Sequence, residues 1–185
     1  MEPRNCSDEA LMREVGFGGT EAIGVLLRRY ASPLLTFIER TVGNRHRAED
    51  LFQEVFLDVW IYRRRYCYPR PFRPWLFGIA LNKCRADMRR SNHTPMPLDD
   101  CPAANPVASD PPPADAAAGA ETAALVAEAV ARMPPTQRAV VTMRVWNGLS
   151  YAEIAEAIGC AEPTVRSHMF HGLATLRKHL EPRLK

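Results

Sequence analysis

Apolar residues recur every three or four positions along most of the chain, and this spacing predicts an all-α fold. The pattern is sharpest in residues 48–60, where Leu51, Val55 and Val59 repeat at four-residue steps. Three aromatic residues follow the same step one position later, so the apolar stripe is wide enough to face a core. The helices expected from such spacing cover residues 20–30, 33–42, 48–60, 74–90, 125–133, 136–147, 151–158 and 162–178.

The polar side of residues 48–60 is acidic. Its side chains lie three or four positions apart, and the segment contains no Lys or Arg that could pair with them along the helix. One interpretation is an ordinary solvated face, with the first carboxylates favouring the positive helix N-terminus. The other is a binding face for a basic partner. The residues that form this face are Asp50, Gln53, Glu54 and Asp58.

Start and stop signals divide the remaining helices. Ser32 followed by Pro33 has the pattern of an N-cap with proline at the first helical position, so a new helix is expected to start there. Ser150 and Glu153 form the S-x-x-E pattern of a capping box, and Gly159 is expected to end the short helix that follows. A turn and another helix come next, which is the layout of a helix-turn-helix.

In a helix-turn-helix, the N-terminal part of the second helix enters the major groove of DNA. That helix is expected here over residues 162–178. Many short helix pairs with glycine turns bind no DNA, and this is the alternative interpretation. The candidates for DNA contact on the second helix are Thr164, Arg166, Ser167, His168, Phe170 and His171.

Residues 61–75 are rich in arginine and aromatic side chains, and prolines at 69, 71 and 74 interrupt the helical pattern. Exposed arginines bind phosphate and aromatic rings stack on bases, so the segment suits single-stranded nucleic acid. The alternative is a loop whose rings fold back onto the core, as is expected of Trp75. A helix resumes at Pro74 and leaves a set of polar side chains available: Asn82, Lys83, Arg85, Arg89 and Arg90.

The composition changes completely in residues 91–120, which contain seven prolines, several alanines and no Lys or Arg. A segment of this kind does not form a core and is expected to be a flexible linker. The chain is therefore predicted to hold two small helical domains, residues 1–90 and 121–185, joined by an acidic Pro/Ala-rich linker at 91–120.

The whole chain is only mildly basic, with a net charge of +3 over 185 residues, so any nucleic-acid affinity has to come from local clusters. Five scattered cysteines without CxxC spacing argue against a disulfide framework or a structural zinc site. The sequence shows no signal-peptide pattern and no apolar run of about eighteen residues, the length that spans a bilayer. We therefore expect a soluble intracellular protein.

No cofactor and no metal are expected. The side chains that an enzyme or a metal sensor could use as ligands are scattered, and their spacing matches no zinc pattern. Such a function remains an alternative that a measurement of bound metal would test. The candidate ligands are Cys84, His93, Cys101, His168 and His171.

Three stretches resemble the bacterial RNA polymerase sigma factors of the extracytoplasmic-function group. They are AEDLFQEVFLDVW at 48–60, FRPWLFGIALNKCRADMRR at 72–90 and MPPTQRAVVTMRVWNGLSYAEIAEAIGCAEPTVRSHMFHGLATLRKHL at 133–180. The resemblance covers most of residues 20–90 and 122–181, in the order of the family and with a linker between them. It implies a non-enzymatic subunit that binds core RNA polymerase and directs promoter recognition and transcription initiation.

The resemblance also implies roles for particular residues. Asp50, Gln53 and Glu54 match the positions that contact polymerase. Phe72 and Asn82 match positions that help to form a pocket for a flipped base of the minus-ten element. By the same resemblance, the neighbouring phosphates are expected to be bound by Arg85, Arg89 and Arg90.

The C-terminal stretch resembles the family's domain for the minus-thirty-five element, and similar strings occur in response-regulator DNA-binding domains. Pro163 stands where the family usually has glycine. His168 and His171 stand where it often has arginine, so this helix is expected to read its element weakly at neutral pH. The resemblance further implies an anti-sigma factor as partner and the bacterial cytoplasm as location. A stand-alone helix-turn-helix regulator that dimerises on a palindromic site is the alternative function.

Overall fold

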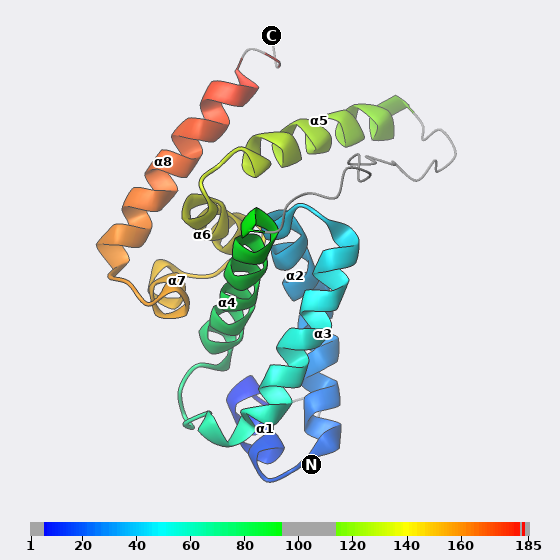
Figure 1. Ribbon diagram of the computed structural model, residues 1–185, viewed down its shortest axis with the longest axis vertical. Helices are drawn as coiled ribbons and strands as arrows, with labels where there is room; N and C mark the ends of the chain where they lie inside the picture. Colours follow the sequence, from blue (N-terminus) through cyan, green and yellow to red (C-terminus); the bar gives the residue numbers. More distant parts are fainter. Residues whose placement is uncertain (1–5, 94–113, 182, 184–185) are drawn as a thin grey trace.

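The computed structural model describes residues 6–93, 114–181 and 183. Within these ranges the chain forms α-helices and one short 3-10 helix but no strand, so the predicted all-α fold is confirmed (Figure 1). The elements in chain order are α1 (Asp8–Gly16), α2 (Thr20–Val42), α3 (Arg45–Ile61), η2 (Arg63–Arg65, the 3-10 helix), α4 (Phe72–His93), α5 (Ala114–Ala131), α6 (Pro135–Val145), α7 (Tyr151–Ile158) and α8 (Glu162–Leu180).

The N-terminal domain is built from α1 to α4. Figure 1 shows α2, α3 and α4 running alongside one another, with α1 at the end near the N-terminus. Each long helix buries one apolar stripe, as the spacing predicted, and Leu51, Val55 and Val59 of α3 are all buried. Gly43 ends α2 in the left-handed conformation at φ 76°, which favours glycine.

The helix break expected at Ser32 is wrong, because α2 runs without interruption through Pro33. Proline inside a helix removes one backbone N–H, and this loss usually kinks or ends the helix. Here Tyr30, Leu34 and Phe37 lie on both sides of Pro33 and are all buried in the same core. We infer that the burial of this continuous stripe outweighs the missing hydrogen bond.

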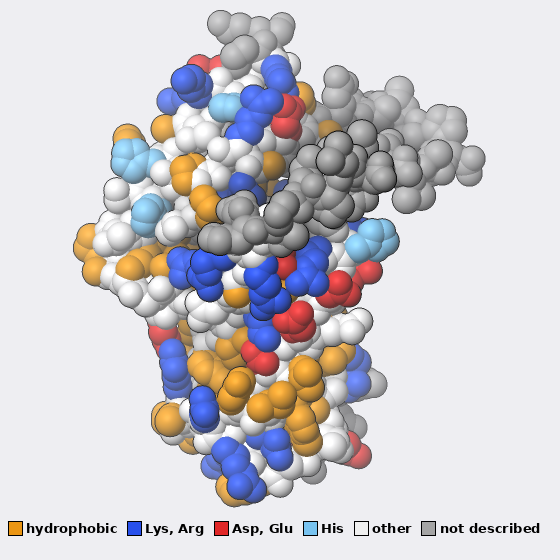
Figure 2. All heavy atoms as spheres, viewed as in Figure 1, with side chains coloured by type: hydrophobic (Ala, Val, Ile, Leu, Met, Phe, Trp, Pro, Cys, Tyr) orange, Lys and Arg blue, Asp and Glu red, His pale blue; other side chains and the backbone are white. Residues whose placement is uncertain are grey.

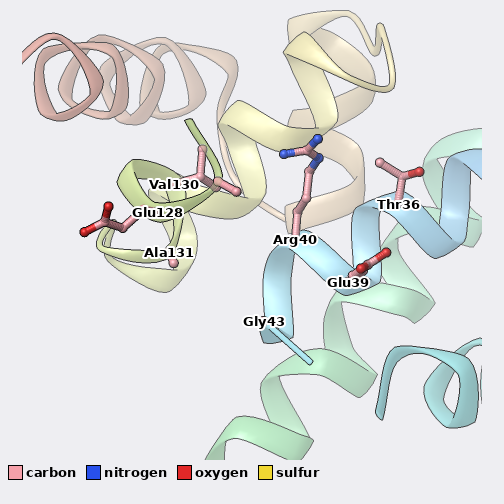
Figure 3. Close-up of a pocket in the computed structure, with 8 residues that line it drawn as sticks. Thr36, Glu39, Arg40, Gly43, Glu128, Val130 and Ala131 are labelled. Carbon is pink, nitrogen blue, oxygen red and sulfur yellow. The ribbon is translucent and has the colours of Figure 1, made fainter. Parts of the chain in front are cut away.

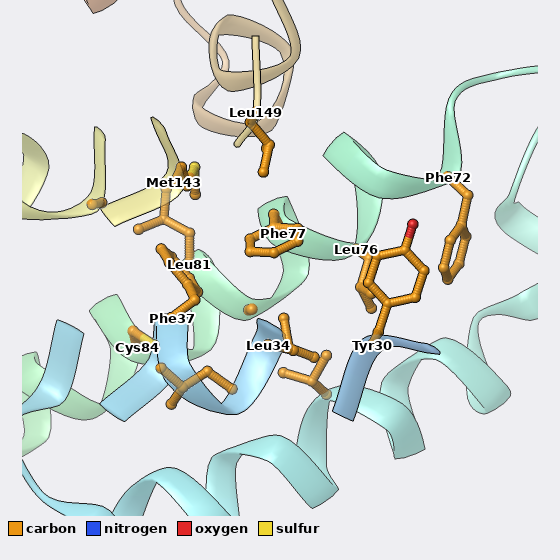
Figure 4. Close-up of a cluster of buried hydrophobic side chains, with 14 of the residues drawn as sticks. Tyr30, Leu34, Phe37, Phe72, Leu76, Phe77, Leu81, Cys84, Met143 and Leu149 are labelled. Carbon is orange, nitrogen blue, oxygen red and sulfur yellow. The ribbon is translucent and has the colours of Figure 1, made fainter. Parts of the chain in front are cut away.

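The core is continuous across the two predicted domains. Figure 4 shows Met143 and Leu149, which lie outside the N-terminal domain, next to Phe77 and Leu81 of α4. All four side chains are buried. The prediction of two separately folded units on a tether therefore missed a shared apolar interface in this conformation.

Polar contacts reinforce that interface. Asn147 donates from Nδ2 to the carbonyl oxygen of Pro33 at 2.8 Å. Arg138 donates from Nη1 to the carbonyl oxygen of Thr41, also at 2.8 Å. Where α4 meets α7, a Cβ added to Gly78 would lie 3.1 Å from the carbonyl oxygen of Ala157, so the two backbones approach closely. Glycine at this position permits the packing.

The predicted linker boundary is partly wrong, because α5 begins at Ala114 and residues 114–120 are helical. The prolines end at position 113, and the alanine-rich stretch that follows has high helix propensity. Average composition over 91–120 concealed this change. The rest of the predicted linker, from residue 94 to 113, lies outside the described residues.

The C-terminal domain contains the predicted helix-turn-helix as α7 and α8. Ser150 Oγ accepts from the backbone N–H of Glu153 at 3.1 Å, and the Glu153 carboxylate accepts from the backbone N–H of Ser150 at 2.7 Å. This reciprocal pair confirms the capping box. Gly159 ends α7 at φ 76°, as expected. Val165 and Met169 of α8 face the core, which leaves the opposite side of that helix exposed.

Candidate functional site

The acidic face of α3 is exposed but not unpaired. Asp50 lies 3.4 Å from Arg47, which also contacts Asp87 of α4 at 2.7 Å. The hydrogen bond to Asp87 is the main cause that raises the pKa of Arg47 above its ordinary value. The prediction of an unpaired face is wrong because it considered only neighbours within residues 48–60, whereas Arg47 lies in the first turn of α3 and Lys83 lies on α4.

Lys83 of α4 is the second cation that pairs with carboxylates of this face. Its Nζ lies 3.0 Å from Asp58 Oδ2 and 3.4 Å from Glu54 Oε2. Burial at this place lowers the pKa of Lys83, but the hydrogen bonds and charges of Asp58 and Glu54 outweigh it and raise the pKa overall. The ammonium therefore stays charged. Figure 2 shows acidic side chains over the region of α3 beside a band of lysine and arginine.

Glu54 nevertheless remains reachable from solvent. Its side chain is 37% exposed and that of Asp50 is 63% exposed, while Gln53 is exposed as well. Surface ion pairs of this kind contribute about 0–1 kcal/mol each, so they are easily exchanged for other partners. The structure thus brings the three sequence-predicted residues together on one accessible face.

A pocket of about 280 Å³ opens where α3 meets α4, next to Asn82. Asn82 is exposed at its rim, as the sequence suggested. The other lining residues were missed as site residues, because Asp58 was assigned only to the acidic face and Lys83 only to the basic helix. Their adjacency depends on the packing of two helices. The full lining is Asp58, Tyr62, Ile79, Asn82 and Lys83.

Phe72 does not belong to this pocket, and the prediction that it is displayed in a loop is wrong. The residue begins α4 and its side chain is fully buried. Its ring lies 5.5 Å from the ring of Tyr30 and 5.9 Å from that of Trp75, measured between centroids. Trp75 folds inward as expected. The short sequence repeat of prolines and aromatics does not tell which ring faces the core.

The three sequence-predicted arginines lie along α4 beyond Asn82. Asn82, Arg85 and Arg89 follow at intervals of three and four, which places them on one side of the helix. Arg89 and Arg90 are exposed and Arg85 is half-buried. This side of α4 is therefore positive from the pocket toward the end of the helix.

A second pocket, of about 440 Å³, joins α1 to the segment after α3. Sequence reasoning identified the basic and aromatic character of this segment but missed the contribution of α1, which no local signal reveals. Arg13 of α1 stacks over the ring of Tyr68 at 5.3 Å. The pocket combines three rings and three guanidinium groups. Its lining residues are Met12, Arg13, Gly16, Phe17, Arg63, Arg64, Tyr66 and Tyr68.

On α8, the sequence-predicted residues form one exposed end of the helix. Thr164, Ser167 and His171 are exposed, whereas His168 is half-buried. Arg166 is also exposed but is held by Glu162 at 2.5 Å. Figure 2 shows histidine side chains at the surface in the region that α8 occupies in Figure 1.

The apolar ring of Phe170 is 71% exposed on the same helix. It lies 5.5 Å from the ring of His171. A single exposed apolar ring is common at protein surfaces, so the exposure shows only that the side chain is accessible. The first turns of α8 are thus available to a ligand.

A further cavity of about 490 Å³ lies between α2 and α5 (Figure 3). Glu39 and Arg40 line it from α2, and Glu128 lines it from α5. Arg40 stacks over the ring of Trp146 at 4.2 Å. The cavity separates the two domains next to their shared interface, and its mixed charges indicate no particular ligand.

Among the described residues, no group of three or more histidine, cysteine and carboxylate side chains is placed to hold a metal ion. Cys84 is buried in α4, where burial raises the pKa of its thiol to about 12. Cys101 lies outside the described residues. None of the helices in the described ranges is both long and apolar enough to cross a membrane.

Comparison with known proteins agrees with this arrangement. Residues 26–94 match the family described as sigma-70 region 2, and residues 123–176 match sigma-70, region 4. The chain is 31% identical to the ECF RNA polymerase sigma factor SigM of Mycobacterium tuberculosis, over 94% of this chain and 85% of that protein. It is 28% identical to the RNA polymerase sigma-H factor of Pseudomonas aeruginosa, over 96% of each chain.

Solved structures show the same fold. The chain is similar to CnrH in its complex with the cytosolic domain of CnrY, with a TM-score of 0.73, 24% identity, and coverage of 95% of this chain and 97% of that one. It is also similar to the sigma factor RpoE of Bartonella quintana in complex with the anti-sigma factor NepR, with a TM-score of 0.64 and 20% identity. That match covers 84% of this chain and 94% of the other.

The matches to sigma-70 regions 2 and 4 over the two helical domains identify a transcription initiation factor. The chain belongs to the extracytoplasmic-function sigma factors of RNA polymerase.

Proposed function

We propose that α3 is the polymerase-binding element and that α4 and α8 contact the promoter. The observation that carries the proposal is the accessible acidic face of Asp50, Gln53 and Glu54, which lies beside a positive helix without being neutralised by strong ion pairs. A basic polymerase surface can replace the weak contacts to Arg47 and Lys83. The chain then acts as a dissociable specificity subunit and performs no catalysis itself.

The test of the polymerase role is charge reversal on α3. Asp50→Lys combined with Glu54→Lys should abolish binding to core polymerase while changing the free energy of unfolding by less than about 1 kcal/mol, since both side chains are at the surface. Glu49→Lys is the matched control, because Glu49 is a half-exposed carboxylate on the same helix that pairs with Arg45 at 3.3 Å. Retained core binding by the double variant would refute the assignment.

The pocket beside Asn82 fits one base of a separated promoter strand. An amide, a phenol, an apolar side chain and the ion pair of Asp58 and Lys83 line about 280 Å³ of space, and the positive side of α4 continues from it. A base enters such a pocket only after the strands separate. Asn82→Ala should therefore reduce open-complex formation more than binding to the closed promoter. Equal losses at both stages would reject this role.

The basic and aromatic pocket between α1 and η2 is a second candidate contact for the separated strand. Arg13, Arg64 and Tyr68 can hold phosphates and stack on bases without reading sequence. The exposed turns of α8 are then left for duplex DNA upstream. Because polymerase holds both domains on one promoter, each contact can be weak on its own.

The proposed location is the bacterial cytoplasm, because the chain has to bind core polymerase and promoter DNA at the same time. One fold relative, RpoE, was solved with the anti-sigma factor NepR, and another, CnrH, was solved with the cytosolic domain of CnrY. An anti-sigma factor is accordingly the further partner proposed for this chain. Co-purification of the tagged chain, with core polymerase as the positive reference, would identify it.

A stand-alone helix-turn-helix regulator is not favoured. Such a protein needs neither a region 2 domain nor an exposed acidic helix, whereas residues 26–94 of this chain match sigma-70 region 2. Dimerisation of the free chain on a palindromic duplex, without polymerase, would support that alternative instead.

A further inference from the structure

Lys83 connects the acidic face of α3 with the pocket beside Asn82. Its ammonium lies 3.0 Å from Asp58, which lines the pocket, and 3.4 Å from Glu54, which belongs to the proposed polymerase face. The Lys83 side chain is only 25% exposed, so it is held in this position by packing as well as by charge. One cation therefore contacts both the proposed polymerase face and the pocket proposed for a base.

We propose that Lys83 is a positioning residue that makes the pocket acceptable to DNA by neutralising Asp58, and that it competes with polymerase for Glu54. The proposal rests on the polymerase and DNA roles proposed above for α3 and α4. It adds a residue whose two effects on initiation have opposite signs.

The first effect concerns DNA. Asp58 is a carboxylate with 23% of its side chain exposed, so salt screens it less than a fully solvated charge. The phosphates flanking a bound base are also negative. Without Lys83, a strand entering the pocket would meet an uncompensated negative charge at short range.

The second effect concerns polymerase. The contact between Lys83 and Glu54 has to be loosened when a basic polymerase surface takes up the Glu54 carboxylate. Loss of Lys83 removes this competition and leaves Glu54 free for polymerase. A variant without the ammonium should thus bind core polymerase at least as well as the unaltered protein but open promoters less well.

The opposite signs separate this role from a purely structural one. If Lys83 only held α3 against α4, its loss would disturb both surfaces, and core binding and promoter opening would fall together. Lys83→Met keeps the apolar stem of the side chain and removes only the charge. Lys83→Arg keeps the charge and is the conservative control.

The experiment compares these variants as complete chains. Affinity for core polymerase is measured by titrating fluorescently labelled chain, and open-complex formation is measured with holoenzyme at saturating core polymerase. For Lys83→Met we expect core affinity that is maintained or raised and promoter opening that falls about tenfold, equivalent to about 1.4 kcal/mol. Lys83→Arg should resemble the unaltered protein in both measurements.

The decisive variant adds Asp58→Asn to Lys83→Met. The neutral amide removes the charge that Lys83 no longer compensates, so promoter opening should recover. The proposal is overturned if opening does not recover, if Lys83→Met leaves opening unchanged, or if it weakens core binding. Failure of the proposed function shows elsewhere, as retained core binding by the Asp50→Lys and Glu54→Lys double variant.

Discussion

Replacement of Phe72 by alanine tests the position of a ring that the sequence assigned to DNA. The structure places Phe72 at the start of α4 with its side chain fully buried. Its ring packs against the rings of Tyr30, Tyr66 and Trp75 at centroid distances of 5.5, 6.2 and 5.9 Å. The substitution therefore removes the centre of an aromatic cluster and should destabilise the fold.

The magnitude follows from burial and packing. A buried Phe→Ala change typically lowers the free energy of unfolding by about 3–5 kcal/mol, through lost transfer energy and the cavity left behind. The surrounding rings are rigid and anchored, since Tyr30 donates to Asp8 at 2.6 Å and Tyr66 to the carbonyl oxygen of Arg70. The site cannot collapse easily, so the upper half of that range is expected. A domain of ordinary stability, about 5–15 kcal/mol, would lose a large part of it.

Urea unfolding followed by far-UV circular dichroism measures this change. Phe170→Ala is the control, because its ring is 71% exposed and its loss should alter stability by less than about 0.5 kcal/mol. A Phe72→Ala variant that loses less than about 1 kcal/mol would refute the buried position and return the ring to the candidates for base contact.

Three further outcomes follow from close contacts and exposure. Gly172→Ala should lower the melting temperature, because the new Cβ would lie 2.5 Å from Val141 Cγ2. The overpacking costs about 1–3 kcal/mol, which exceeds the gain in helix propensity. Adding Val141→Ala to this variant should restore the melting temperature. Cys84 should resist maleimide in the folded protein at mildly alkaline pH while exposed Cys67 reacts, as peptide mass mapping would show. Burial raises the pKa of Cys84 to about 12, so its neutral thiol favours the folded state up to its ordinary pKa near 9, and this contribution is lost as the pH rises toward 12. His171→Arg should steepen the salt dependence of holoenzyme binding to the upstream element by about one phosphate contact, and an unchanged slope would show that this exposed position does not face DNA.

Local signals in the sequence were sufficient for most helices. The apolar stripe of Leu51, Val55 and Val59 depends only on helical spacing, and all three side chains are buried. The capping box at Ser150 and the left-handed glycine at 159 depend on residues within a few positions of one another. Such signals act over one or two turns, which is why they can be read without knowledge of the fold.

Signals of the same kind failed where packing outweighed them. Pro33 has the pattern of a helix start, yet α2 continues because its apolar stripe is buried on both sides of the proline. Composition over residues 91–120 predicted a linker, although the alanines after position 113 form the start of α5. At Pro33 a local preference of a few kcal/mol was outweighed by burial, whereas at residue 114 the average composition concealed a local helix propensity.

In the candidate site, too, some features follow from local sequence and others only from packing. The amino-acid sequence determined that α3 carries an acidic face with Asp50 and Glu54, and that a basic helix with Asn82 follows it. Only the tertiary structure decided that Lys83 joins the two by reaching both Glu54 and Asp58, and that the ring of Phe72 turns inward. These relations connect residues that lie about 25 to 40 positions apart, such as Asp58 with Lys83 and Tyr30 with Phe72. No periodicity within one helix specifies which side of a neighbouring helix it meets, because that choice is made by the fit of side chains across the whole core.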